Sequence, residues 1–163
     1  MGNRLEGKVA VVSGGGRGIG RAVALLLAEE KASVVVNDLG CEVDGTGSWK
    51  DPADQVVAEI TRNGGTALAS YEDVSTMEGG DRLIQRAFDT YGSMGVLVNS
   101  VGVRRDGMIF QMSPEEWDVV LRNSLKSYFT TTKHACILMR QQRGGRIVNL
   151  TADAGLGAIG MSK

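Results

Sequence analysis

The sequence predicts a doubly wound α/β fold, in which helices cover both faces of a parallel sheet. Short runs rich in β-branched residues alternate along the chain with longer segments whose apolar residues recur at helical spacing. The short runs are apolar throughout, which is typical of parallel strands buried on both faces. The chain also contains 23 glycines, about twice the average usage, and many of them stand at the junctions between these segments.

Five strands and four helices are expected from local signals along the chain. Residues 33–38 read SVVVND, which is too short and too β-branched for a helix. Pro52 stands in the first turn of the second helix and Gly64 follows its end, whereas Ser113-Pro-Glu-Glu is typical of a capped, acidic helix start. The expected strands are residues 8–13, 33–38, 66–70, 95–99 and 145–150. The expected helices are residues 19–31, 52–62, 79–91 and 113–140.

Composition and charge exclude several classes of function. Lysine and arginine number 18 against 19 aspartates and glutamates, so the formal net charge of -1 gives no electrostatic footprint for a nucleic acid or an acidic membrane. The longest apolar run, residues 22–28, is far shorter than the roughly 20 residues that span a bilayer. Cys41 and Cys136 lie far apart, with His134 as the one histidine, so neither a disulfide scaffold nor a metal site is expected. We expect a soluble, cytoplasmic, single-domain protein that acts on a small molecule.

A glycine-rich turn, residues 13–20 (SGGGRGIG), lies where the first strand meets the first helix. Free backbone N–H groups and the helix dipole make this position an anion site. A nucleoside-triphosphate loop would need Lys-Ser or Lys-Thr near its last glycine, but Arg21 follows Gly20. The pattern that fits is Gly14-x-x-x-Gly18-x-Gly20 rather than G-x-G-x-x-G. Tight packing alone would explain one or two of these glycines, so the turn favours binding of a dinucleotide.

Two charged residues beside the turn each allow two interpretations. Asp38 ends the second strand, at the spacing where a carboxylate accepts hydrogen bonds from the adenine ribose and repels a 2′-phosphate. This role favours NAD over NADP; the alternative is that Asp38 caps a turn. Arg17 either reaches the cofactor phosphates or is a solvated cation at a loop tip. The connection after Asp38, residues 39–51, is unusually long and polar, and such loops are either functional or mobile.

Three motifs together resemble the short-chain dehydrogenase/reductase family, over residues 5–163. The turn is similar to the family's Thr-Gly-x-x-x-Gly-Ile-Gly, Asp73-Val74 to an Asp-Val that contacts adenine, and residues 99–102 (NSVG) to Asn-Asn-Ala-Gly. The resemblance implies a Rossmann fold with strand order 3-2-1-4-5. It also implies cofactor contacts from Ser13, Gly14, Arg17, Gly18, Ile19, Gly20, Asp38, Asp73, Val74, Asn99 and Gly102.

Within the family, three segments resemble the hydroxyacyl-CoA dehydrogenase branch of the multifunctional β-oxidation enzymes. They are residues 34–40 with the long loop that follows, residues 105–106 and residues 116–118. The resemblance implies NAD(P)-dependent hydride transfer to or from an alcohol or carbonyl carbon, with a hydroxyacyl or ketoacyl thioester as substrate. It further implies a homo-oligomer assembled through the helix over residues 115–140.

The catalytic positions depart from the family pattern. The family uses a tyrosinate and a nearby lysine, a serine that binds the substrate oxygen, and an asparagine that holds a water. Alignment puts Ala152 at the serine position with Thr151 beside it, and Ser124 at the asparagine position with Asn123 one residue earlier. Thr151, Asn123 and Ser124 are therefore the only catalytic candidates. Either Asn123 compensates through a local shift of the helix, or the role of the asparagine is lost.

The family's Tyr-x-x-x-Lys pair is expected just past Lys163, and no tyrosine follows Tyr128. We therefore expect a C-terminally incomplete Rossmann domain whose sheet stops after the fifth strand. Two functions follow as alternatives. One is an oxidoreductase of this family, represented by its cofactor-binding part. The other is a non-catalytic dinucleotide-binding or interaction module, a degenerate or truncated copy.

Overall fold

The computed structural model describes residues 2–152. The Tyr-x-x-x-Lys pair expected just past Lys163 therefore lies outside the described residues. A single five-stranded sheet runs through it, with the order β3-β2-β1-β4-β5 and every neighbouring pair parallel. The predicted fold class and strand order are confirmed. The strands are β1 (Val9–Ser13), β2 (Ser33–Asn37), β3 (Thr66–Ser70), β4 (Val96–Asn99) and β5 (Arg146–Asn149).

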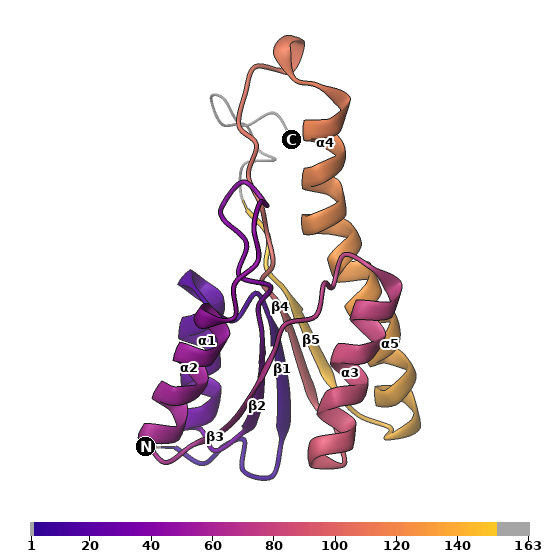
Figure 1. Ribbon diagram of the computed structural model, residues 1–163. Helices are drawn as coiled ribbons and strands as arrows, with labels where there is room; N and C mark the ends of the chain where they lie inside the picture. Colours follow the sequence, from indigo (N-terminus) through magenta and orange to yellow (C-terminus); the bar gives the residue numbers. More distant parts are fainter. Residues whose placement is uncertain (1, 153–163) are drawn as a thin grey trace.

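Helices cover both faces of this sheet, as Figure 1 shows. On one face α1 and α2 pack together, and on the other α3 packs against α5. Every element ends within two residues of the range predicted for it, apart from the helix predicted over residues 113–140. The helices are α1 (Gly18–Glu29), α2 (Asp51–Arg62), α3 (Met77–Tyr91), α4 (Pro114–Val120) and α5 (Ser127–Gln141), and a 3₁₀ turn spans Ile109–Gln111.

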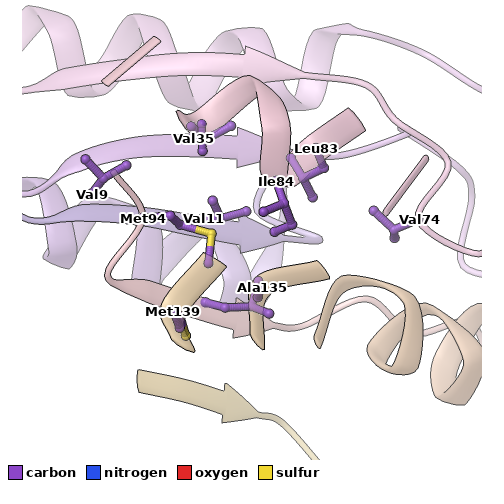
Figure 2. Close-up of a cluster of buried hydrophobic side chains, with 11 residues drawn as sticks. Val9, Val11, Val35, Val74, Leu83, Ile84, Met94, Ala135 and Met139 are labelled. Atoms are coloured by element: carbon purple, nitrogen blue, oxygen red, sulfur yellow. The ribbon is translucent and has the colours of Figure 1, made fainter. Parts of the chain in front are cut away.

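Two hydrophobic cores lie on opposite faces of the sheet because alternate residues of β1 point to opposite sides. Val11 faces α3 and α5, where it joins Leu83, Met94 and Ala135 in the cluster drawn in Figure 2. Val12 faces the other core, made with α1 and α2. β1 is buried along its whole length, as expected for a central parallel strand.

The sheet changes from apolar to polar at the carboxyl ends of its strands. The register aligns one polar residue from each strand across the sheet at this edge. In the order of the strands, these residues are Ser70, Asn37, Ser13, Asn99 and Asn149. The loops that carry the glycine turn and the long connection leave the sheet here, so this edge positions the candidate site.

The single long helix predicted over residues 113–140 is wrong in its middle. Its start is as expected, because Ser113 and Glu116 form a reciprocal capping box. Leu121–Lys126 is π-helical, and it separates α4 from α5. The amide of Asn123 donates to the carbonyl of Val119 at 2.8 Å, so a side chain takes an acceptor from the regular helical ladder. Polar side chains that bond to nearby backbone in this way weaken regular helix pairing, which explains why the widened turn forms here.

None of the helices within residues 2–152 combines the length and the apolar character needed to cross a membrane.

Candidate functional site

A cleft of about 640 Å³ lies beyond the carboxyl ends of β1, β2 and β4. From β1 the chain adds β2 and β3 on one side, and it then returns to add β4 and β5 on the other side of β1. The strand order therefore reverses between β1 and β4. In doubly wound folds, such a switch point is where ligands bind. We call it the first cleft. It is lined by nine of the residues singled out from the sequence, namely Gly14, Arg17, Gly18, Ile19, Asp38, Asp73, Val74, Gly102 and Asn123.

The glycine turn forms one wall of the first cleft and leaves the start of α1 open to it. Gly14 has φ +73°, and a Cβ on it would lie 2.8 Å from the backbone of Ser100, so a side chain does not fit. Helix α1 begins at Gly18 without a side-chain cap from Arg17 and without an acidic residue in its first turn. Its first N–H groups and its positive dipole end are therefore available to an anion.

Asp38 holds the turn and the long connection together. One carboxylate oxygen accepts from the N–H of Gly16 at 2.8 Å, and the other accepts from the N–H of Gly40 at 2.8 Å. The turn-capping alternative therefore describes a contact that is present. Each carboxylate oxygen has a second acceptor position, and Asp38 also lines the first cleft. The ribose role is thus compatible with the cap and stays a prediction.

Arg17 is exposed, and it makes a contact that neither of the two interpretations from the sequence included. Its Nη1 donates to the carbonyl oxygen of Cys41 at 2.9 Å, so the guanidinium ties the glycine turn to the long connection. The same side chain lines the first cleft. A contact with cofactor phosphates remains a prediction.

Three of the expected cofactor contacts, Ser13, Gly20 and Asn99, do not line the first cleft but lie beneath it. A Cβ on Gly20 would lie 2.0 Å from the carbonyl oxygen of Gly14, so Gly20 allows α1 to pack directly on the turn. Ser13 and Asn99 are buried, and the hydroxyl of Ser13 donates to Oδ1 of Asn99 at 3.0 Å.

Asn99 is the centre of a buried hydrogen-bond network. Its Oδ1 accepts from Thr131 at 2.8 Å as well as from Ser13, and its Nδ2 donates to Asn149 at 2.8 Å and to Thr132 at 3.3 Å. All four positions of the amide are used, which fixes the ends of β1, β4 and β5 relative to α5. Sequence reasoning missed the partners on α5, although the three adjacent threonines at 130–132 were a usable signal.

The loop after β3, residues 71–75, is held by Asn37, which sequence reasoning also missed. Its Oδ1 accepts from the N–H of Glu72 at 2.9 Å, and its Nδ2 donates to the carbonyl of Glu72 at 3.2 Å. The next residue, Asp73, accepts from the N–H of Ser75 at 3.0 Å. These contacts shape the wall formed by Asp73 and Val74.

A second cavity, of about 990 Å³, lies on the other side of the segment over residues 100–104. Ser124, Tyr128, Thr151 and Ala152 line it, so two of the three catalytic candidates face this cavity. Asn123 faces the first cleft instead. Burial raises the pKa of the Tyr128 phenol above its ordinary value, so this hydroxyl stays protonated at neutral pH. Among the described residues, the lining of the second cavity therefore includes several hydroxyl groups, those of Ser124, Tyr128 and Thr151 among them.

Within residues 2–152, histidine, cysteine and acidic side chains form no cluster of three that suits a metal ion.

Comparison with known proteins gives a consistent family. The model of the short chain dehydrogenase family matches residues 8–162. Peroxisomal multifunctional enzyme type 2 of Mus musculus is 42% identical over 153 residues, which cover 94% of this chain and 20% of that protein. Hydroxyacyl-CoA dehydrogenase ChsB1 of Mycobacterium tuberculosis is 38% identical over 167 residues, with 97% and 51% covered.

A solved structure agrees with these sequence matches. A 7α-hydroxysteroid dehydrogenase, solved with NADH and 7-oxo glycochenodeoxycholic acid, superposes with a TM-score of 0.85 at 30% identity, covering 95% of this chain and 57% of that one. The chain thus spans about a fifth to three fifths of the length of these relatives. Because the family model matches residues 8–162, which is almost the whole of this sequence, the chain belongs to the short-chain dehydrogenase family.

Proposed function

We propose that this chain is the dinucleotide-binding part of an NAD-dependent oxidoreductase. The observation that carries the proposal is the uncapped start of α1, which opens on a cleft at the switch point of the sheet. When bound there, the dinucleotide supplies the hydride acceptor or donor for an alcohol or carbonyl carbon. The chain's own part is to bind the pyrophosphate with backbone N–H groups and to position the nicotinamide ring beside the second cavity.

Preference for NAD over NADP is proposed on the basis of Asp38. Its carboxylate lines the first cleft, where it offers acceptors to ribose hydroxyls and like charge to a 2′-phosphate. Arg17 is the nearest candidate cation for such a phosphate, but its Nη1 is already used by Cys41.

For the substrate, we propose a hydroxyacyl or ketoacyl thioester. The second cavity suits an acyl chain because Val101, Leu121, Leu125 and Leu150 contribute to its lining. The name of the mycobacterial relative, a hydroxyacyl-CoA dehydrogenase, fits this proposal. A cytoplasmic location also remains a proposal.

Titration with NADH tests cofactor binding and has a matched pair of variants. Gly18 and Gly92 both have positive φ, and neither has an atom within 4 Å of an added Cβ. Only Gly18 lines the first cleft, whereas Gly92 ends α3 on the far side of the sheet. Gly18→Ala should weaken NADH binding at least tenfold while Gly92→Ala leaves it unchanged. Equal NADH binding by both variants would show that the glycine turn does not contribute to the cofactor site.

A non-catalytic dinucleotide-binding module is the second candidate, and the alanine at position 152 favours it. Ala152 lines the second cavity but has no hydroxyl for a substrate oxygen. This candidate predicts NADH binding without turnover in the protein that contains this chain, whichever acyl thioester is offered. Turnover that falls with Gly18→Ala would exclude it.

A homo-oligomer is proposed through the helical segment over residues 115–140. Leu121, Leu125 and Phe129 are exposed at successive four-residue steps and form one apolar stripe. Sedimentation of Leu125→Glu should give a smaller species than the parent protein. Leu26 is also exposed, but it lies on α1. Leu26→Glu is therefore the matched control and should leave the assembly intact.

A further inference from the structure

The long connection after β2 is an ordered loop whose two ends meet. The N–H of Trp49 donates to the carbonyl of Leu39 at 3.1 Å, and the Ser48 hydroxyl donates to the same oxygen at 3.0 Å. We call residues 41–47, between these ends, the strap. Figure 1 shows the connection rising beyond the carboxyl ends of the strands, beside the segment that follows β4.

The tip of the strap is folded on itself. The N–H of Glu42 donates to the carbonyl of Thr46 at 2.8 Å, and the N–H of Gly45 donates to the carbonyl of Glu42 at 2.9 Å. Asp44 accepts from both the N–H and the hydroxyl of Thr46, at 2.9 and 2.7 Å. The strap can therefore move as a preformed unit rather than as a loose chain.

The tip is fastened to the segment after β4, across the first cleft. The N–H of Arg104 donates to the carbonyl of Val43 at 2.9 Å, and Nη2 of Arg105 lies 3.8 Å from Oδ2 of Asp44. A Cβ on Gly45 would lie 3.3 Å from Cγ1 of Val103. On the glycine-turn side, Arg17 donates to the carbonyl of Cys41.

The fastening is light compared with the rest of the fold. It includes one backbone hydrogen bond and one ion pair, and a Cβ on Gly45 would be in van der Waals range of Val103 and, at 3.6 Å, of Cγ1 of Val119 on α4. Both members of the ion pair are partly exposed, with side chains 31% and 46% accessible, so water and salt weaken their attraction. By contrast, β1 is held by backbone pairing to strands on both sides.

We propose that the strap is a latch over the first cleft, which must open at Arg104 and Arg105 for a dinucleotide to enter or leave. Cys41, Glu42 and Val43 line the cleft on one side, and Val103 and Arg104 line it on the other, so the latch joins opposite walls. This inference rests on the proposed function, because it concerns exchange of the same cofactor. The latch sets the rates of association and dissociation together, so opening it changes both rates more than it changes the dissociation constant.

A reversible disulfide gives the sharpest test. A Cβ on Gly45 would lie 3.7 Å from the Cβ of Val103, close to the mean Cβ separation of about 3.8 Å in disulfides. Gly45→Cys with Val103→Cys, in a background with Cys41→Ser and Cys136→Ser, should lock the latch when oxidised. Stopped-flow fluorescence should then show NADH association and dissociation slowed at least tenfold, and dithiothreitol should restore both rates.

A single substitution tests the same latch without a disulfide, in case the cysteine pair strains the tip. Asp44→Asn keeps an oxygen for Thr46 and removes the charge that faces Arg105. We expect NADH to dissociate about threefold faster. Glu30→Gln neutralises a surface ion pair with Arg4 on the far end of α1, and it should leave the rate unchanged.

The outcomes separate the latch from the proposed function. Equal NADH exchange in the oxidised and reduced cysteine pair, together with an unchanged rate in Asp44→Asn, would overturn the latch and leave the cofactor site standing. Failure of the parent protein to bind any NADH would overturn the proposed function, and the latch with it.

Discussion

The two cavities share the wall made by residues 100–104, yet they differ in what they offer a ligand. The first cleft has an open helix start, a carboxylate and backbone N–H groups, which are the parts that a dinucleotide site needs. The second cavity has hydroxyl groups on Ser124, Tyr128 and Thr151, but Ala152 replaces the serine expected there. Under the proposed function, cofactor binding and proton transfer depend on different segments of the chain, and one can be complete while the other is not.

The largest expected effect concerns turnover. In these 163 residues no tyrosine follows Tyr128, and burial raises the pKa of the Tyr128 phenol, which makes it a weaker proton donor at neutral pH. Loss of general acid–base catalysis costs about 10²–10⁴ in rate. We expect residues 1–163 to bind NADH but to oxidise it with ketoacyl thioesters at least a hundredfold more slowly than a family member that contains Tyr-x-x-x-Lys, measured by the absorbance of NADH.

The same assay has a gain-of-function arm. Addition of a downstream segment with Tyr-x-x-x-Lys should restore turnover, and Ala152→Ser should raise it further. Ordinary turnover by residues 1–163 that disappears in Gly18→Ala would contradict this difference between the two cavities. It would mean that another residue supplies the proton.

The next effect concerns the wall beneath both cavities. Asn99→Ala leaves the buried hydroxyls of Ser13 and Thr131 without their shared acceptor, whereas Asn149, which is exposed, can turn to water. Unsatisfied buried groups cost about 1–3 kcal/mol each, so we expect a loss of about 3 kcal/mol in the free energy of unfolding. Urea denaturation measures it, with exposed Asn63→Ala as control. A loss below about 1 kcal/mol would show that the network is dispensable.

A smaller effect is expected for cofactor preference. Asp38→Ala should reduce the ratio of NADH to NADPH affinity about tenfold, or roughly 1.4 kcal/mol, because like charge no longer faces the 2′-phosphate. The variant should also be less stable, since the N–H groups of Gly16 and Gly40 lose their acceptor. Parallel titrations with both cofactors give the ratio, with exposed Asp89→Ala on α3 as control. An unchanged ratio would leave Asp38 with its turn-capping role alone.

The smallest effect is the ionisation of Tyr128. Burial raises its pKa, so the folded protein holds this proton at a pH where the unfolded chain has lost it. The tyrosine therefore contributes stability below the ordinary tyrosine pKa of about 10, and this stability is lost as the pH rises through the folded pKa. The pKa of Tyr128 is measured as the difference between the ultraviolet titration curves of the parent protein and the Tyr128→Phe variant. Ionisation of Tyr128 near pH 7 would contradict this expectation, because the second cavity would then contain a base.

The sequence was sufficient for the sheet and for most of the first cleft. β-branched runs, glycines and helix-capping residues act within a few neighbours, so the strand order, the capping box at Ser113 and the position of the glycine turn could be predicted. Eight of the expected cofactor contacts line the first cleft because their motifs lie at or just after the ends of strands.

The contacts that could not be predicted join residues far apart in the chain. Asn99 meets Ser13 and Asn149 only because β1, β4 and β5 lie side by side, and Arg105 meets Asp44 only because two loops leave the same edge of the sheet. The π-helical segment was missed for a different reason. Its apolar spacing is that of an ordinary helix, and one side-chain bond from Asn123 shifts the backbone pairing.

The close packing of α1 on the glycine turn also has a consequence for the thermodynamics of ligand binding. Because a Cβ on Gly20 would lie 2.0 Å from the carbonyl oxygen of Gly14, the turn and the helix start touch through backbone alone. An anion held there by backbone N–H groups immobilises no flexible side chains. Ordering of one such side chain costs about 0.5–1.5 kcal/mol of entropy on binding. The turn therefore avoids a penalty that a lysine or arginine clamp would incur, and its anion site is preorganised before any ligand arrives.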